Sequence, residues 1–118
     1  MPELGIRPAV PVDNCLVITG QLAGSCEIRT SPAGVEISHF LLEHHSGQVE
    51  AGVLREVRCR IPVIACGESF ACIIRQLLPG LPLRVQGFIS RANYREGEYR
   101  LVLHATHIDI LDIESSEG

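Results

Sequence analysis

Residues 49–63 alternate between apolar and polar side chains more regularly than any other part of the chain. The odd positions are apolar except for Arg55, whereas the even positions are mostly polar. A period of two is typical of a half-buried antiparallel strand. The pattern therefore predicts a strand with Arg58 and Arg60 on its outward face. It places Arg55 on the apolar face, at a bulge or in a subunit contact.

Four further segments predict strands because they are rich in β-branched and apolar residues and are separated by turn residues. They cover residues 15–24, 35–45, 81–92 and 99–111. Ser31–Gly34 and Ser46-Gly47 predict the turns on either side of the second strand. Gly87 within the fourth strand predicts a bulge or sharp bend, and a change of apolar parity along the last strand predicts a bulge near Thr106.

One helix is predicted between the third and fourth strands. Apolar residues recur there at helical spacing, at Phe70, Ile73, Ile74, Leu77 and Leu78, and Pro79-Gly80 ends the pattern. Long, bent strands of this number lose their open edges by closing on themselves. The order of elements therefore predicts an all-β, five-stranded OB-fold barrel with one helix between the third and fourth strands.

The chain is long enough for one domain with a core of its own. Residues 1–12 hold three prolines and predict a flexible leader, residues 13–112 form the OB-fold domain, and residues 113–118 form an acidic tail. The first residues lack the basic and apolar regions of a secretory signal, and no apolar run reaches the roughly 18 residues of a membrane span. We therefore expect a cytoplasmic protein.

The formal net charge of −4 is unevenly distributed. Four acidic residues and no cation lie from Asp109 onward, so the rest of the chain, with ten arginines and ten acidic residues, is neutral. Residues 84–100 hold four arginines against Glu96 and Glu98, and local potential governs binding more than the total charge does. A neutral barrel with a basic segment predicts modest affinity for a polyanion, held by arginine forks that suit phosphate.

Cysteine and histidine positions give no support to a metal site, a cofactor or catalysis. The five cysteines lack any Cys-x-x-Cys spacing and are expected to be buried, reduced thiols. His44 and His45 point to opposite faces of one strand, whereas zinc needs convergent ligands. Nothing marks the base or oxyanion site that a Cys–His nucleophile needs, and no phosphate-binding GxxxxGK[ST] loop occurs.

Four motifs, in order and at matching spacing, resemble the family of bacterial primosomal replication protein N (PriB). They are Phe40–His44 (FLLEH) with Ser46, Cys59–Ile64 (CRIPVI), Val85–Ser90 (VQGFIS) and Val102–Ala105 (VLHA). The resemblance spans roughly residues 13–112. It implies a homodimeric, non-catalytic OB-fold protein of replication restart, related to bacterial single-stranded DNA-binding protein.

The same resemblance implies the partners and the weak points of the site. The partners would be single-stranded DNA, the restart helicase (PriA) and the primosomal loader protein (DnaT), with single-stranded DNA-binding protein as a further partner. Better-known members carry aromatic residues where this chain has Val53 and Arg58, and lysines where it has Asn93, Arg95 and Arg100. Loss of one stacking residue is worth about 1–3 kcal/mol per base, part of which Arg58 can recover by stacking.

The candidate DNA-binding residues combine the outward arginines of the third strand with the loop between the fourth and fifth strands. They are Arg55, Arg58, Arg60, Arg91, Tyr94, Arg95, Tyr99 and Arg100. The alternatives are ion pairs with Glu56, Glu96 and Glu98 for the arginines, and cross-strand packing for the tyrosines. Phe40, Phe70 and Phe88 are expected in the core.

Three functions remain open at this point. The first is a single-stranded DNA binder of the restart primosome that uses arginine–phosphate contacts and limited stacking. The second is an adaptor that stimulates the helicase and binds DNA weakly, which the scarce aromatic residues and the neutral barrel favour. In the third, the acidic tail mimics single-stranded DNA or occupies the chain's own groove.

Overall fold

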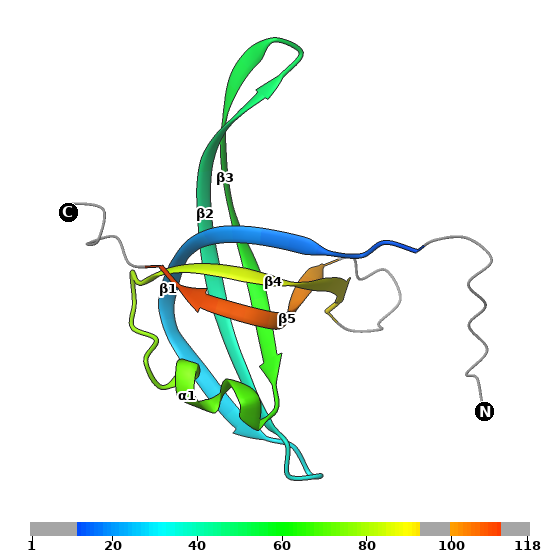
Figure 1. Cartoon of the computed structure of the whole chain (residues 1–118), viewed down its shortest axis with the longest axis vertical. Helices are drawn as coiled ribbons and strands as arrows, with labels where there is room; N and C mark the ends of the chain where they lie inside the picture. The colour runs from blue at the N-terminus through cyan, green and yellow to red at the C-terminus, as the bar shows by residue number, and fades with distance from the viewer. Residues whose placement is uncertain (1–11, 93–99, 112–118) are drawn as a thin grey trace.

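Five strands and one short helical segment form a closed barrel in the computed structural model, which describes residues 12–92 and 100–111 (Figure 1). The elements are β1 (Leu16–Thr30), β2 (Glu36–Glu50), β3 (Val53–Cys66), the 3-10 turn η1 (Glu68–Phe70), α1 (Ala71–Ile74), β4 (Pro82–Arg91) and β5 (Leu101–Ile110). Neighbouring strands follow the order β1-β2-β3-β5-β4. This confirms the predicted all-β OB-fold barrel with its helix between the third and fourth strands.

Two of the predicted segments lie mostly outside the residues that the structure describes. The acidic tail at 113–118 lies outside the described residues, as does the leader at 1–12 apart from Val12. No helix in the described part of the chain is long and apolar enough to cross a bilayer.

β1 closes the barrel because it pairs with two different strands along its length. Leu16–Gln21 pair with β4, and the strand then bends so that its second half pairs with β2. Gly20 lies at this change of partner, where a Cβ would stand 2.3 Å from the carbonyl oxygen of Glu43. Only glycine permits this close approach of the two backbones.

The end predicted for the first strand at Gly24 is wrong. β1 continues to Thr30, because Gly24, whose φ is 78°, lies within a bulge between Ala23 and Glu27. The glycine therefore bends the strand instead of ending it.

Aliphatic side chains from all five strands fill the barrel interior. Leu42, Leu83, Val85 and Leu103 have relative exposures of 0%, and Leu22, Phe40 and Val63 are also buried. Ile74 and Leu77 from the helical segment cover one end of this core. Burial of each such side chain is worth about 1.5–3 kcal/mol, so the core holds the strands that carry the surface described below.

A bulge interrupts the register between β4 and β5 at the position that the sequence predicts. Gln86 pairs with His107 and Gly87 with Ala105, so Thr106 is the extra residue, and its hydroxyl donates to the Gln86 carbonyl over 3.1 Å. Both the bend at Gly87 and the bulge near Thr106 are confirmed.

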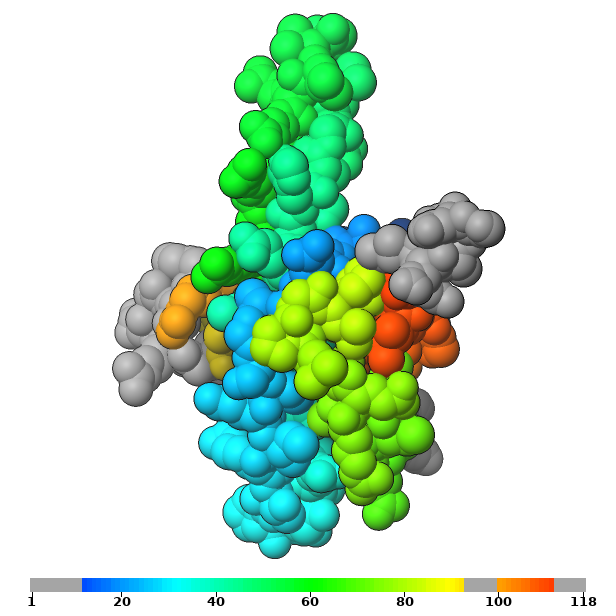
Figure 2. Space-filling view, turned by 90° about the vertical axis from the view of Figure 1, so that its left-hand side faces the viewer, coloured from blue at the N-terminus to red at the C-terminus, as the bar shows by residue number. Residues whose placement is uncertain are grey.

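The upper parts of β2 and β3 extend beyond the barrel as a two-stranded arm, residues 44–59 (Figures 1 and 2). β1 pairs with β2 only as far as Glu43, and β5 pairs with β3 only at Val63 and Ile64. At the tip of the arm, Val49 and Leu54 are each 73% exposed. The regular alternation of residues 49–63 thus reflects a half-buried strand only in its lower part.

The predicted turn at Ser46-Gly47 is also wrong. Gly47 pairs with Glu56 within the arm, and the chain turns instead at Ala51-Gly52, whose φ values are 53° and 77°. Two positive φ values in a two-residue loop match the twist of a hairpin. Alanine rarely adopts this conformation, so the sequence signal at Ala51 was weak.

The helical segment is shorter than its apolar spacing suggests. α1 ends at Ile74, and the bonds from Gln76 N to Ile73 O and from Leu77 N to Ile74 O tighten the chain after it. Leu78, predicted on the packing face, is 65% exposed. One turn of helix is enough to cover the end of the barrel.

Candidate nucleic-acid interface

The outer face of β2 and β3 carries a line of charged side chains that begins at the base of the arm. Residues directly opposite in paired strands share a face, and Glu43 pairs with Arg60 while His45 pairs with Arg58. Both arginines are exposed. The prediction that Arg58 and Arg60 share an outward face is therefore confirmed.

Carboxylates accompany these arginines. Glu56 accepts from His45 Nε2 at 2.8 Å and from Arg58 Nη2 at 3.3 Å, while Arg60 Nε lies 3.8 Å from Glu43 Oε2. The hydrogen bond from His45, and then that from Arg58, lowers the pKa of the Glu56 carboxyl group. These pairs are exposed to solvent, so a phosphate can compete for the arginines, but it must displace the carboxylates.

Arg55 lies on the opposite face of the arm. It pairs across the strands with Gln48, and its Nε donates to Glu50 Oε1 over 3.0 Å. The structure places Arg55 on a regular, exposed stretch of β3, so the predicted bulge at this position is wrong. Arg55 does not join Arg58 and Arg60 in one cluster.

The second group of candidate arginines lies at the base of the β4–β5 loop. Arg91 ends β4 and Arg100 precedes β5, and the bond from Ala92 N to Arg100 O, 2.8 Å long, joins the two sides of the loop. The other three loop candidates, Tyr94, Arg95 and Tyr99, lie outside the described residues.

A groove of about 500 Å³ connects this loop base with the outer face of the barrel. Leu41, Pro62 and Ile64 give it an apolar floor. Polar and charged side chains also line it, at Ser25, Glu27, His39 and Arg100. An apolar floor with basic groups beside it suits bases and phosphates together.

His39, which lines this groove, contacts Arg29, and the sequence did not single out this pair. Arg29 Nη2 lies 3.3 Å from His39 Nε2. A guanidinium has no acceptor, so the imidazole accepts through a neutral Nε2. The prediction missed this pair because the two residues belong to different strands, and only the register of β1 and β2 brings them together.

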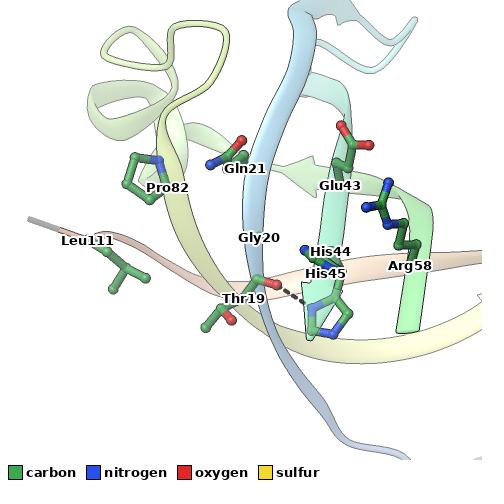
Figure 3. A pocket seen from close by; sticks show the side chains of 9 residues that line it. All are labelled: Thr19, Gly20, Gln21, Glu43, His44, His45, Arg58, Pro82 and Leu111. Carbon is green, nitrogen blue, oxygen red and sulfur yellow. Dashed lines mark hydrogen bonds between the residues drawn. The ribbon is translucent and has the colours of Figure 1, made fainter. Parts of the chain in front are cut away.

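A second cavity, of about 510 Å³, lies where β1 changes its partner (Figure 3). His44 Nδ1 donates to the Thr19 carbonyl over 2.7 Å, so its Nε2 accepts from the Ser46 hydroxyl over 2.8 Å. Both ring nitrogens are thereby used to fix the base of the arm. We assign His44 a structural role, in agreement with the prediction that His44 and His45 point apart.

The cysteines and acidic residues of the described ranges form no metal site. No group of three or more His, Cys, Asp or Glu side chains there is placed to hold an ion. The five thiols are free, but Cys15, Cys59, Cys66 and Cys72 are exposed, so the expectation of buried thiols is wrong. Only Cys26 is partly covered, and burial raises the pKa of its thiol.

Replacement of Glu56 with glutamine is expected to tighten binding of single-stranded DNA roughly two- to fivefold at low salt. The change removes the carboxylate that engages His45 and Arg58 and so leaves both for phosphate. Fluorescence anisotropy with a labelled oligothymidylate measures the effect. Glu68→Gln, an equal charge change in η1 at the helical end of the barrel, is the control, and equal tightening in both variants would contradict the local explanation.

Comparison with known proteins agrees with this geometry. The family described as "another single-strand binding protein family" matches residues 14–107. The chain is 39% identical over 108 residues to replication restart protein PriB of Actinobacillus pleuropneumoniae serotype 5b, covering 92% of this chain and 87% of that protein. It is 40% identical over 99 residues to PriB of Serratia proteamaculans, covering 84% and 94%.

A solved structure shows the same architecture. PriB from Ralstonia solanacearum superposes with a TM-score of 0.73 at 27% identity, covering 86% of this chain and all of that one. The barrel, the resemblance in its strands and these relatives agree, and the chain belongs to the PriB family of replication restart proteins, within the single-strand binding proteins.

Proposed function

We propose that this protein binds single-stranded DNA as a non-catalytic component of the replication-restart primosome. The observation that carries the proposal is the groove on the outer face of the barrel, with its floor of Leu41, Pro62 and Ile64 and with Arg100 in its lining. The names of the relatives, replication restart proteins, support the same role. Such a role implies a cytoplasmic location.

The strand would lie with its bases toward the apolar floor and its phosphates toward arginines. Arg100 lines this groove, and the bond from Ala92 N to Arg100 O holds Arg91 and Arg100 at the two sides of the same loop base. Arg58 and Arg60 lie on the neighbouring outer face of β3 and are not among the residues that line this groove. We therefore propose that Arg91 and Arg100, together with Arg95, Tyr94 and Tyr99, make the main contacts, and that Arg58 and Arg60 extend them.

The proposed partners follow from membership in the family. We propose that the chain acts as a homodimer and assists the restart helicase (PriA) and the primosomal loader protein (DnaT), with single-stranded DNA-binding protein as a further partner. Each of these contacts is open to direct binding measurements with the purified proteins.

Binding is expected to weaken linearly with added salt on logarithmic axes, with a slope of about −0.7 per phosphate contacted. Arginine contacts release counterions from the strand, so three to five contacts would give a slope of roughly −2 to −3.5. Anisotropy titrations between low and moderate salt measure it. Absence of single-strand binding at low salt would overturn the proposed function.

A second candidate function is an adaptor that binds the helicase through the arm. The arm tip exposes Val49, Val53 and Leu54, and Arg55 and Arg58 nearby are both paired with carboxylates. An exposed apolar tip with balanced charges favours a protein surface over a polyanion. Helicase stimulation by a variant that no longer binds DNA separates the two functions.

A further inference from the structure

Five outward side chains form a continuous row across the barrel. Register pairs link Glu27 of β1 to His39 of β2, His39 to Ile64 of β3, Ile64 to His104 of β5, and His104 to Phe88 of β4. Directly opposite residues point to the same side of a sheet. We call these five residues the cross-strand row, and its members Glu27, His39 and Ile64 line the groove described above.

The end of the row on β4 and β5 is an aromatic stack. The rings of Phe88 and His104 lie 5.0 Å apart between centroids and are inclined by only 8°. Phe88 is 42% exposed, whereas Phe40 is buried and Phe70 is partly buried against the core. Because His104 covers one face of the Phe88 ring, a ligand that stacks on the ring must use its other face.

The expectation that Phe88 belongs to the core is therefore wrong, and the alternation along β4 shows why. Leu83, Val85 and Gly87 are buried, while Arg84, Gln86 and Phe88 are exposed. The backbone next to Phe88 is also held firmly, since the Asn14 side chain bonds both to Ile89 N at 2.8 Å and to Ile89 O at 2.9 Å. A phenylalanine kept outside on a fixed strand is a surface that can accept a ligand.

The charges around the stack favour a polyanion. Arg84 lies on the same face of β4 as Phe88, directly opposite Asp109 of β5, while Arg91 ends the strand three residues beyond Phe88 and starts from the other face. Asp109, the one carboxylate in the described residues of β4 and β5, bonds to His107 over 3.1 Å. Exposed aromatic rings beside arginines are the arrangement that holds single strands through stacked bases.

We propose that the Phe88–His104 stack is a base-stacking site, which a single strand reaches by following the cross-strand row from the groove. One base packs on the open face of Phe88 while arginines hold the flanking phosphates. The site rests on the proposed function, because it extends the path of the same DNA strand from β2 and β3 onto β4 and β5.

Fluorescence gives the first test, because the chain contains no tryptophan. In a Phe88→Trp variant, addition of oligothymidylate should quench the new indole, and affinity should stay within about twofold of the original because indole also stacks on bases. Leu78→Trp, at an exposed apolar position beyond α1, is the control and should show no quenching. Equal signals at the two positions would overturn the proposal.

Affinity gives the second test. Phe88→Ala should weaken binding of oligothymidylate about tenfold with an unchanged salt slope, and should leave binding of an abasic oligomer of equal length unaltered. His104→Ala should give a smaller loss in the same direction. A thermal melt shows whether the Phe88→Ala and His104→Ala variants are folded. If they are not, quenching of the Phe88→Trp fluorescence by oligothymidylate is the test of the proposal.

The two proposals fail in distinguishable ways. If the original protein binds no single-stranded DNA at low salt, both the proposed function and the stacking site are overturned. If it binds DNA but Phe88→Ala binds oligothymidylate with unchanged affinity, only the stacking site is overturned. If Phe88→Ala weakens both oligomers equally, the residue acts on the backbone contacts, and the stacking site is again overturned.

Discussion

A Gly87→Ala variant is expected to lose at least about 3 kcal/mol of unfolding free energy, among the largest effects that a single methyl group can have. A Cβ at this position would lie 1.9 Å from the carbonyl oxygen of His104 and 2.8 Å from its carbonyl carbon. The obstacle is backbone on the neighbouring strand, which cannot rotate away as a side chain could. Relief requires β4 and β5 to separate at their bulge.

The loss is measured by thermal or urea unfolding followed by circular dichroism. At about 4–8 °C per kcal/mol, the midpoint should fall by more than roughly 12 °C. Gly47→Ala is the matched control, since the added Cβ meets only Leu54 Cδ1 at the ordinary distance of 3.4 Å. Equal unfolding midpoints for the two variants would show that the stability of the protein does not depend on the close approach of β4 and β5 at Gly87.

Reversal of both Arg91 and Arg100 to glutamate is expected to weaken single-stranded DNA binding about a hundredfold at low salt. The change removes two cations from the base of the β4–β5 loop and places two anions beside the groove that Arg100 lines. Since two phosphate contacts are lost, the slope of log affinity against log salt should also become shallower by about 1.4.

The matched comparison reverses Arg58 and Arg60 instead. Glu56 and Glu43 already accompany these arginines, so we expect a loss of about tenfold or less. A larger loss from this pair than from Arg91 and Arg100 would move the main contact surface to β3. The same Arg91 and Arg100 variant in a helicase assay tests the adaptor function, because retained stimulation would show that DNA binding is not needed for it.

The barrel follows from the sequence because its determinants are local and periodic. Alternation, turn residues and the parity change at Thr106 specify the strands and the β4–β5 bulge without knowledge of long-range pairing. The ends of the elements depend on tertiary contacts and were predicted less well. Gly24 and Gly47 are typical loop residues, but one enters a bulge and the other pairs with Glu56.

The candidate site could be predicted only in part, since residue types do not reveal their partners. The shared face of Arg58 and Arg60 follows from their spacing, whereas their carboxylate contacts depend on the register of β2 and β3. Phe88 could have been placed correctly by continuing the alternation of β4 from Leu83. The contact of Arg29 with His39 had no signal in the sequence at all.

The arm has a consequence for how copies of this protein avoid one another. Apart from β3, no described strand pairs with β2 beyond Glu43, and apart from β2, no described strand pairs with β3 before Val63, so the outer edge of each strand in the arm is left open. Open edges of this kind invite addition of strands from other molecules, and charged side chains along them oppose it. The charged side chains of Glu50, Arg55, Glu56 and Arg58 therefore oppose strand addition at the arm, which is a role for charge that is separate from DNA binding.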